Sequence, residues 1–388
     1  MEGRSVQVTA QRALVVAADM LTPYGAGADA LWTGLLSGRT AISGVTRFST
    51  QAFQSSSAGC VDGLSYHQGE SLALQMLRRL FSRTQGAIPT NASLLLATTK
   101  GEIDILEQAV LTGGNDPAES GLGRLARKTA DLAGLTGEVL VLSAACASAS
   151  AATARAAAMV RSGRSDCVLV AACDGVTEFV YAGFSSLMAL DPHGARPFDR
   201  GRKGLTVGEA AAYALIMSED RARREGRPVL GEIAGWGMSD DANHMTGPSR
   251  TSEGLVLAIK KALQSAGAAG EEIGCISAHG TGTVYNDAME MGAFRAVFGP
   301  QPLPIYSVKG GIGHTMGAAG LVEIITALRA LAEATVPPTV NLREPDHDAE
   351  GWVSSVAHPL VGKRAALVTN AGFSGINTAV IVRAEARG

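Results

Sequence analysis

The sequence lacks any long hydrophobic run. No apolar stretch approaches the ~18 residues that a membrane-spanning helix needs, so we expect no transmembrane segment. The first residues, MEGRSVQVTAQR, are polar and do not have the apolar centre of a secretory signal. The sequence therefore predicts a cytoplasmic protein with no leader peptide.

Cysteine is scarce and net charge is small. Five cysteines among 388 residues, without regular spacing, make a disulfide framework unexpected and predict reduced thiols. Lysine and arginine number 33 against 36 acidic residues, and no basic block stands out, so nucleic-acid binding is not indicated. The hydrophobic fraction of 46% excludes a disordered chain and is enough for a large core.

Glycine is plentiful, at 47 residues, and short apolar runs recur along the whole chain. Most of these runs are too uniformly apolar for a sheet with one wet face, so they predict strands buried on both faces. The predicted strands are 13–17, 93–98, 139–143, 167–172, 213–218, 231–236, 274–278, 304–308, 365–370 and 378–383.

Helical patterns lie between these runs. Residues 27–37 place leucines on one face and end at Gly38, and residues 318–335 show helical spacing that stops at Pro337. Alternating strands and helices predict an α/β fold with mostly parallel sheets. The polar stretch 220–228 is the expected boundary between two halves.

Cys146 lies between a predicted strand and a predicted helix. The strand at 139–143 leads to Cys146, and the alanine-rich residues 147–161 that follow favour a helix strongly. A helix N-terminus can lower a thiol pKa and so create a nucleophile. The alternative is a structural, buried cysteine. The cysteines that fit this alternative lie in or beside apolar strands: Cys167, Cys173 and Cys275.

Two histidines also follow predicted strands. His279 opens the turn HGTGT, and His314 lies in the glycine-rich turn KGGIGHTMG. Two histidines without a third ligand at a useful spacing do not predict a zinc site, and neither GxGxxG nor a P-loop is present, so we expect no metal and no cofactor. One cysteine and two histidines at strand ends instead suggest thioester chemistry, in which the histidines donate hydrogen bonds to a carbonyl oxygen.

Together these motifs resemble those of a β-ketoacyl-acyl-carrier-protein synthase of the elongating type, in the thiolase-fold superfamily. The resemblance runs nearly from end to end, and the order of the motifs is that of the family. The segments that carry it are 21–25, 31–38, 144–148, 191–192, 196–199, 208–210, 241–248, 279–283 with Asp287 and Glu290, 307–323, and 372–377.

This resemblance implies a thiolase-like five-layer αβαβα sandwich made of two similar halves. Residues 1–225 would form the half that carries the nucleophilic cysteine, and residues 226–388 the half that carries both histidines. Members of the family dimerise through the sheet edge near the nucleophile, so a homodimer, or a heterodimer with another ketosynthase-like chain, is implied. The implied substrates are acyl and malonyl forms of an acyl-carrier protein.

The resemblance also implies a role for each catalytic residue. Cys146 would take the acyl chain as a thioester. His279 and His314 would bind the malonyl thioester carbonyl and assist the loss of CO2, and the resulting carbanion would attack the acyl group. Lys309 would hold charge and orientation near His314, and Glu323 would belong to the supporting network. No metal takes part in this scheme.

The remaining implied site residues surround the acyl group. The backbone N–H groups of Cys146 and Phe373 would form the oxyanion hole. Phe184 and Phe373 would gate the acyl pocket, and Thr281 and Thr283 would contact substrate.

The chain departs from the family pattern in two places. The closing loop at 370–377 is about one residue short and has Ser374 in place of glycine, which permits backbone angles that serine disfavours. The segment 50–138 is also short for the family. These departures suggest a specialised polyketide, polyene or fatty-acid pathway rather than housekeeping synthesis.

Several basic residues are candidates for roles outside the catalytic group. Lys100, in the sequence TTKG, fits a solvated charge better than a functional group. The basic side chains that could meet an acidic carrier protein are Arg78, Arg79, Arg202 and Lys203.

Three other functions are alternatives to the condensing enzyme. A non-catalytic partner subunit would typically lack the nucleophile, although this chain could be the active half of a heterodimer. A thiolase would need a second cysteine near the last glycine-rich loop. The chain-starting relatives have histidine and asparagine where this chain has two histidines.

Overall fold

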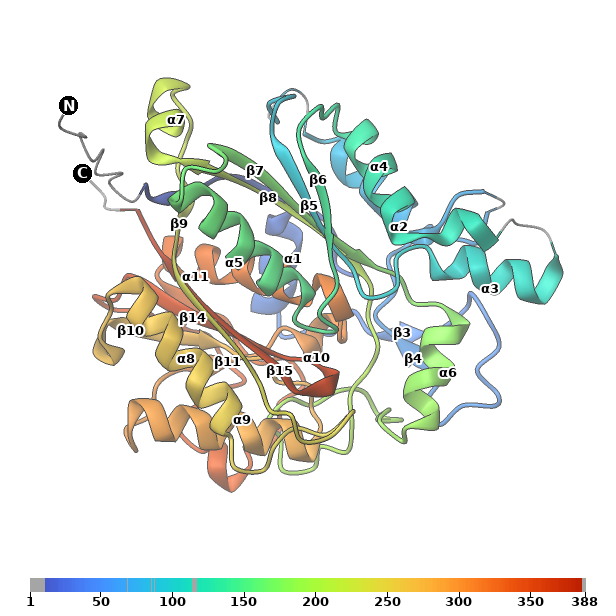
Figure 1. Ribbon diagram of the computed structural model, residues 1–388. Coiled ribbons are helices and arrows are strands. Elements are labelled where there is room, and N and C mark those ends of the chain that lie inside the picture. Colours follow the sequence, from blue (N-terminus) through green and yellow to red (C-terminus); the bar gives the residue numbers. More distant parts are fainter. Residues whose placement is uncertain (1–10, 68, 85, 87, 114–116, 386–388) are drawn as a thin grey trace.

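The computed structural model describes residues 11–385 except 68, 85, 87 and 114–116 (Figure 1). The segment 1–10, for which the sequence predicted no leader, lies outside the described residues. Among the described residues, no helix is both long and apolar enough to span a membrane.

The longer strands and helices alternate along the chain as predicted. The strands of the large sheet are β1 (Ala13–Thr22), β2 (Gly25–Ala26), β5 (Ser93–Ala97), β6 (Val139–Leu142), β7 (Cys167–Asp174), β8 (Ala210–Ser218), β9 (Gly231–Asp240), β10 (Ile273–Ser277), β11 (Ile305–Tyr306), β14 (Ala365–Ala371) and β15 (Ile376–Arg383). The short strands outside it are β3 (Ser43–Gly44), β4 (Ser57–Ala58), β12 (Thr335–Val336) and β13 (His358–Pro359).

Eleven α-helices lie in the described part of the chain. They are α1 (Ala28–Leu36), α2 (Leu72–Phe81), α3 (Ile103–Thr112), α4 (Leu122–Leu132), α5 (Ser148–Arg161), α6 (Glu178–Ser186), α7 (Glu219–Arg224), α8 (Glu253–Ala266), α9 (Val284–Phe298), α10 (Lys309–Ile312) and α11 (Ala319–Ala332). The two helices predicted from leucine spacing correspond to α1 and α11.

The sheet consists of two halves with the same internal order. One half runs β1-β8-β7-β5-β6 and the other β9-β15-β14-β10-β11. In each half the first two pairs are antiparallel and the last two are parallel. The expectation of mostly parallel sheets therefore holds only for the outer three strands of each half. An antiparallel contact between β1 and β9 joins the halves through Leu14 with Glu232 and Val15 with Gly231.

Five layers result from the helices that cover these half-sheets (Figure 1). Helices α2 and α4 cover the outer face of the first half, α8 and α9 cover that of the second, and α5 and α11 lie between the halves. One apolar cluster fills the middle layer and two others fill the outer layers. The predicted five-layer αβαβα sandwich is confirmed.

Small residues allow the two middle helices to approach closely. Helix α5 buries Ala149, Ala152 and Ala156 at helical spacing. On α11, a Cβ atom added to Gly320 would lie 2.1 Å from Ser150 Oγ and 2.7 Å from the Ser150 nitrogen of α5. This close packing brings the N-terminal ends of α5 and α11, with the loops before them, to one place.

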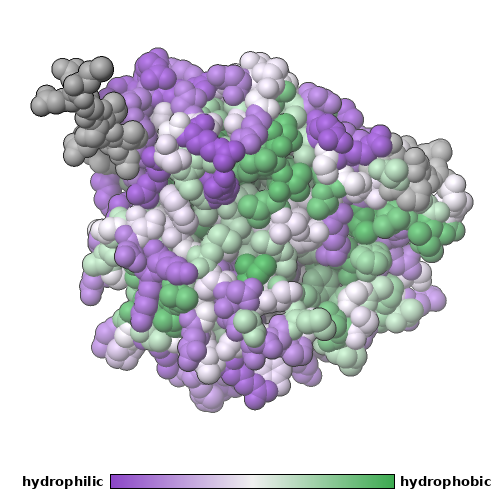
Figure 2. Space-filling view, in the orientation of Figure 1, coloured by the Kyte–Doolittle hydropathy of each residue, from purple (hydrophilic) through white to green (hydrophobic). Residues whose placement is uncertain are grey.

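The β6 strand lies at one end of the sheet, and β11 lies at the other. Its four residues are half-buried, and apolar side chains gather over this edge and over α3 on the face seen in Figure 2. Leu106, Val110 and Leu111 of α3 are among the exposed apolar residues.

Candidate active site

Cys146 lies in the turn between β6 and α5, as the sequence predicted. Ala145 before it adopts a left-handed backbone conformation with φ 49°, which is uncommon for a residue other than glycine. Ser148 holds the turn: its hydroxyl donates to Ala145 O at 2.6 Å and accepts from Ala144 N at 2.8 Å. Cys146 is 7% exposed and lies directly before the first turn of α5.

His279 follows β10 and is held by a buried glutamate of α9. The Glu290 carboxylate accepts hydrogen bonds from the backbone nitrogens of His279, at 2.8 Å, and Gly280, at 2.7 Å. Gly280 has φ 40°, and a Cβ there would lie 2.7 Å from Ser307 Cβ. Glycine is thus required by both conformation and space.

His314 is fixed by the strand-like segment 205–209. Its backbone nitrogen donates to Thr206 O at 2.7 Å, and its carbonyl accepts from Gly208 N at 2.9 Å. A Cβ on Gly208 would lie 2.2 Å from Ile312 O, so only glycine allows this contact. The first half of the chain therefore positions a histidine of the second half.

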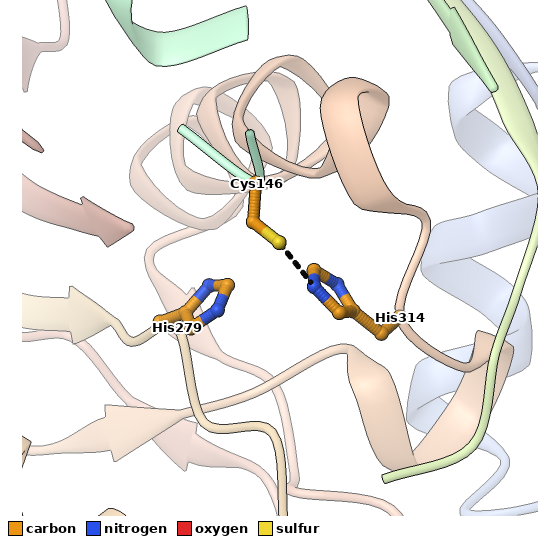
Figure 3. A group of neighbouring side chains, drawn as sticks. All are labelled: Cys146, His279 and His314. Atoms are coloured by element: carbon orange, nitrogen blue, oxygen red, sulfur yellow. Dashed lines mark hydrogen bonds between the residues drawn. The ribbon is translucent and has the colours of Figure 1, made fainter. Parts of the chain in front are cut away.

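The fold brings the predicted cysteine and both histidines together (Figure 3). Cys146 Sγ lies 3.0 Å from His314 Nε2. The two imidazole rings are nearly perpendicular, at 86°, with centroids 5.0 Å apart. His279 and His314 are each 2% exposed. The thiol thus lies between two desolvated imidazoles.

Burial dominates the electrostatics of this group. It raises the pKa of the Cys146 thiol to about 11, although Lys100, Lys309 and the N–H of Phe373 act in the opposite direction. The predicted lowering of this pKa was therefore wrong. Burial and the charge of Lys309 also hold the pKa values of His279 and His314 well below the usual range. At neutral pH a neutral thiol faces two neutral imidazoles.

Lys309 and Glu323 form a fully buried ion pair beside His279. The Lys309 ammonium donates to Glu323 Oε1 and to the carbonyl oxygen of His279. Lys309 was expected to lie near His314. Its hydrogen bond reaches the His279 backbone, and its charge acts on both the His279 and the His314 rings.

The residues predicted to surround the acyl group also converge here. A cavity of about 450 Å³ is lined by Cys146 and both histidines together with Phe184, Phe373, Thr281 and Thr283. The Phe184 and Phe373 rings are in contact, with centroids 5.8 Å apart. The Thr281 and Thr283 hydroxyls lie 2.9 Å from one another. The Phe373 N–H faces Cys146 closely enough to affect the thiol pKa.

The closing loop contains a serine in a backbone conformation that favours glycine. Ser374 adopts φ 71° and ψ 9°, a left-handed conformation that glycine would adopt without strain. Gly372 permits the loop to approach the nucleophile, because a Cβ there would lie 3.3 Å from Cys146 N.

The sulfur and the histidine nitrogens could also be considered as metal ligands. One ligand atom from each of Cys146, His279 and His314 lies within 4.8 Å of the others. The two histidines have no third ligand near them in the sequence, whereas the fold supplies Cys146. The positive charges of Lys309 and Lys100 act on the same atoms and disfavour a dication.

Two basic residues differ from their predicted environment. Arg202 is 7% exposed and bound to Asp199 O and Asp346, so it cannot meet a carrier protein. Lys100 is half-buried rather than fully solvated, and its charge acts on Cys146 and His314. Lys203 is exposed and lines the cavity, in agreement with its prediction as a surface residue.

Sequence reasoning missed two buried polar residues near the site. Asp174, at the end of β7, accepts hydrogen bonds from Thr98, Thr99 and Gly317, and so ties the loop after β5 to the turn after His314. Asn370 lies behind His279 and contacts Glu323. A strand ending in a polar residue was the available signal for both, but it does not distinguish capping from catalysis.

A five-layer sandwich of two similar halves, with a buried cysteine beside two histidines, defines a thiolase-like condensing enzyme. Two family models agree with this class. The β-ketoacyl synthase N-terminal domain matches residues 114–222, and the β-ketoacyl synthase C-terminal domain matches residues 230–343. The chain belongs to the β-ketoacyl synthase family, whose members are acyltransferases.

Individual relatives fall in both fatty-acid and polyketide synthesis. The 3-oxoacyl-[acyl-carrier-protein] synthase 2 of Vibrio cholerae is 28% identical over 96% of this chain and 99% of its own. The ketoacyl synthase alpha subunit of the tetracenomycin polyketide synthase of Streptomyces glaucescens is 29% identical over 96% and 97%. The solved ishigamide ketosynthase/chain length factor is 29% identical, with a TM-score of 0.89 over 97% and 100%.

Proposed function

We propose that this chain catalyses a decarboxylative Claisen condensation between an acyl thioester and malonyl-acyl-carrier protein. The product is a 3-oxoacyl-acyl-carrier protein. The observation that carries this proposal is the buried Cys146 sulfur 3.0 Å from His314 Nε2, with His279 beside it, in a cavity that can admit a thioester.

In the first half-reaction Cys146 attacks the carbonyl carbon of the acyl thioester. Because burial raises the pKa of the thiol to about 11, the proton must leave as the bond forms, and His314 Nε2 lies within hydrogen-bond distance to take it. The N–H groups of Cys146 and Phe373 hold the oxyanion. The carrier thiolate leaves and takes the proton from His314, and the acyl group remains on sulfur.

In the second half-reaction malonyl-acyl-carrier protein occupies the cavity. His279 and His314 donate N–H groups to its thioester carbonyl oxygen, where negative charge develops. The bond from the carboxylate to the α-carbon breaks, CO2 leaves, and the electron pair forms an enolate. The α-carbon then attacks the acyl carbon on Cys146, the carbon–sulfur bond breaks, and the sulfur takes up one proton.

The supporting residues hold this arrangement in place. Lys309 donates to the His279 carbonyl and pairs with Glu323, which supports its role in orienting His279. Thr281 and Thr283 line the cavity as hydroxyl donors for the carrier's prosthetic arm. Phe184 and Phe373, in mutual contact, act as the gate to the acyl pocket. No metal and no cofactor are required by this scheme.

The assembly we propose is a dimer joined at the β6 edge. Support comes from the outer side of β6, which pairs with no other strand in the described part of the chain, from its half-buried apolar side chains, and from the apolar surface around it (Figure 2). We also propose 1–225 and 226–388 as the two halves, with the polar connection between β8 and β9 as their boundary. A free Cys146 thiol is consistent with a cytoplasmic location.

The pathway we propose is specialised polyketide, polyene or fatty-acid synthesis. The left-handed Ser374 loop and the short 50–138 segment support it. A second candidate is that activity or chain length depends on another ketosynthase-like chain. The likeness to a ketosynthase/chain length factor over nearly the whole chain favours that candidate.

Intact-protein mass tests the proposal directly. The protein is mixed with an acyl-carrier protein that bears a medium-length acyl chain, and then with malonyl-carrier protein, with Cys146→Ala as the control. We expect an acyl adduct on the native protein only, discharged by malonyl-carrier protein to give a product two carbons longer. No adduct with any acyl length, alone or with a co-expressed second ketosynthase chain, would contradict it.

A further inference from the structure

Behind His279 lies a buried polar chain centred on Asn370, the penultimate residue of β14. The Asn370 side chain is fully buried. Its Oδ1 accepts from the hydroxyl of Ser150 on α5. Its Nδ2 donates to Glu323 Oε2 at 2.6 Å and lies 3.4 Å from His279 Nδ1.

The chemistry of these partners fixes which way the amide points. Glu323 is paired with Lys309 and can only accept hydrogen bonds as a carboxylate. If the amide were flipped, its carbonyl oxygen would face this carboxylate, and two buried acceptors would meet without a proton. The amide NH2 therefore faces both Glu323 and the His279 ring.

An NH2 group beside His279 Nδ1 determines the tautomer of the imidazole. The NH2 can only donate, so the nitrogen that meets it must offer a lone pair. The single proton of the neutral ring then lies on Nε2. Burial and the charge of Lys309 hold the pKa of His279 well below its usual range, so the ring stays neutral. Nε2–H is the form that can donate to a carbonyl oxygen.

Close packing holds these hydrogen-bonded polar side chains in place. A Cβ on Gly320 of α11 would lie 2.1 Å from Ser150 Oγ and 2.7 Å from Asn370 Oδ1, so glycine there lets the three elements meet. Lys309 binds the carbonyl of His279, and Asn370 faces its ring. The Lys309–Glu323 ion pair therefore supports both the backbone and the ring of His279. Lys309 binds the carbonyl, and Glu323 holds the amide that faces the ring.

His314 has a different environment. Its Nδ1 is buried and has no hydrogen-bond partner among the described residues, and its Nε2 faces the thiol of Cys146. Nothing described fixes the proton of this ring on one nitrogen. His314 can therefore exchange a proton with sulfur, as the first half-reaction requires.

We propose that Asn370 is a positioning residue that fixes His279 as the Nε2–H tautomer, so that His279 serves as a permanent donor to the malonyl thioester carbonyl. This proposal rests on the proposed condensation. It assigns different roles to the two histidines. His279 only donates a hydrogen bond, whereas His314 also accepts a proton.

Asn370→Asp tests this at nearly constant size. Because two buried carboxylates cannot meet without a proton, one proton is held between the new carboxylate and Glu323. The oxygen that replaces Nδ2 can then accept from Nδ1–H, which moves the ring proton away from Nε2. We expect malonyl decarboxylation and condensation to fall about 100-fold, the cost of one lost oxyanion donor. Acyl transfer to Cys146, followed by intact mass, should change by less than about fivefold, because His314 and the N–H groups near sulfur are unaffected.

Two further measurements separate this role from a structural one. In ¹⁵N-histidine-labelled protein, with His279 assigned by the His279→Gln variant, the nitrogen shifts should report Nε2–H in the native enzyme and Nδ1–H in Asn370→Asp. The matched control is Asn91→Asp, because the Asn91 side-chain oxygen accepts from the Arg221 guanidinium and a carboxylate can accept in the same way. It should leave the His279 shifts and both partial reactions unchanged.

Ser150→Ala is the second variant, should Asn370→Asp fail to fold. Without the hydroxyl that holds Oδ1, decarboxylation should fall about three- to tenfold with acyl transfer retained. The proposal is wrong if native His279 carries its proton on Nδ1, or if both partial reactions fall together in a folded variant. A native enzyme that forms no acyl adduct would instead contradict the proposed function, and the tautomer would still be measurable.

Discussion

Alkylation of Cys146 should accelerate about tenfold for each pH unit through the neutral range, because only the thiolate reacts. Burial raises the pKa of this thiol to about 11. At pH 7.5 the thiolate fraction is then about 3 in 10,000, against about 1 in 10 for an exposed cysteine of pKa ~8.5. The Cys146 thiol is mostly protonated at every pH below its raised pKa. The alkylation rate should therefore reach no plateau before pH 9.5.

Iodoacetamide labelling, followed by intact mass from pH 6.5 to 9.5, measures this slope. Cys146→Ala corrects for labelling of Cys60, which is half-buried. Lys100→Met should slow the reaction at each pH, since Lys100 lowers the pKa of Cys146. The exposed Lys260 provides the control Lys260→Met, which should have no effect. A plateau below pH 8 would refute the reasoning, because it would mean that the helix N-terminus and the lysines outweigh burial.

Three other substitutions test how the site is supported. Glu209→Gln should destabilise the fold by about 3–5 kcal/mol in urea unfolding, since Glu209 holds the nearly buried Arg47 at 2.8 Å, and a loss below 1 kcal/mol would contradict this. Gly208→Ala should lower both the urea midpoint and condensation, because its Cβ would lie 2.2 Å from Ile312 O; unchanged values would show that the His314 loop can shift freely. Ser374→Gly should leave stability equal or raise it by up to about 1 kcal/mol, as the relief of left-handed strain exceeds the entropy cost of glycine. A fall in melting temperature would count against the strain argument.

The strands and the catalytic group were predictable because their signals are local. Uniformly apolar runs become strands wherever a sheet is covered on both faces, and the chain offers few other uses for them. Cys146 and the two histidines each follow such a run, but β6 lies at one end of the strand order and β10 and β11 lie at the other, so the packing of the two halves is what brings these residues together. The sequence showed serine in place of the family's glycine at position 374, but it did not predict the left-handed conformation that Ser374 adopts.

Other features depend on contacts between distant residues. Strand direction was wrong for β1 and β8 because apolar composition does not encode pairing. The raised pKa of Cys146 reflects packing from both halves, which the local helix signal could not include. In the sequence Arg202 looks like a surface arginine. Its burial depends on an ion pair with Asp346, which lies far along the chain. Asn370 has no distinguishing feature in the sequence beyond its place at a strand end. Its role follows from its contacts with Ser150, Glu323 and His279, which only the fold brings together.

The repeated strand order also has a consequence for cooperativity. Helix α5 of one half packs against β9 and β15 of the other, and α11 packs against β1 and β8 in return. Neither half can bury its inner sheet face alone, so an isolated half would expose the middle apolar cluster to water. The arrangement of Cys146, His279 and His314 therefore forms and is lost in one cooperative step. When one half unfolds, the other half keeps neither a nucleophile in a closed pocket nor a base beside it.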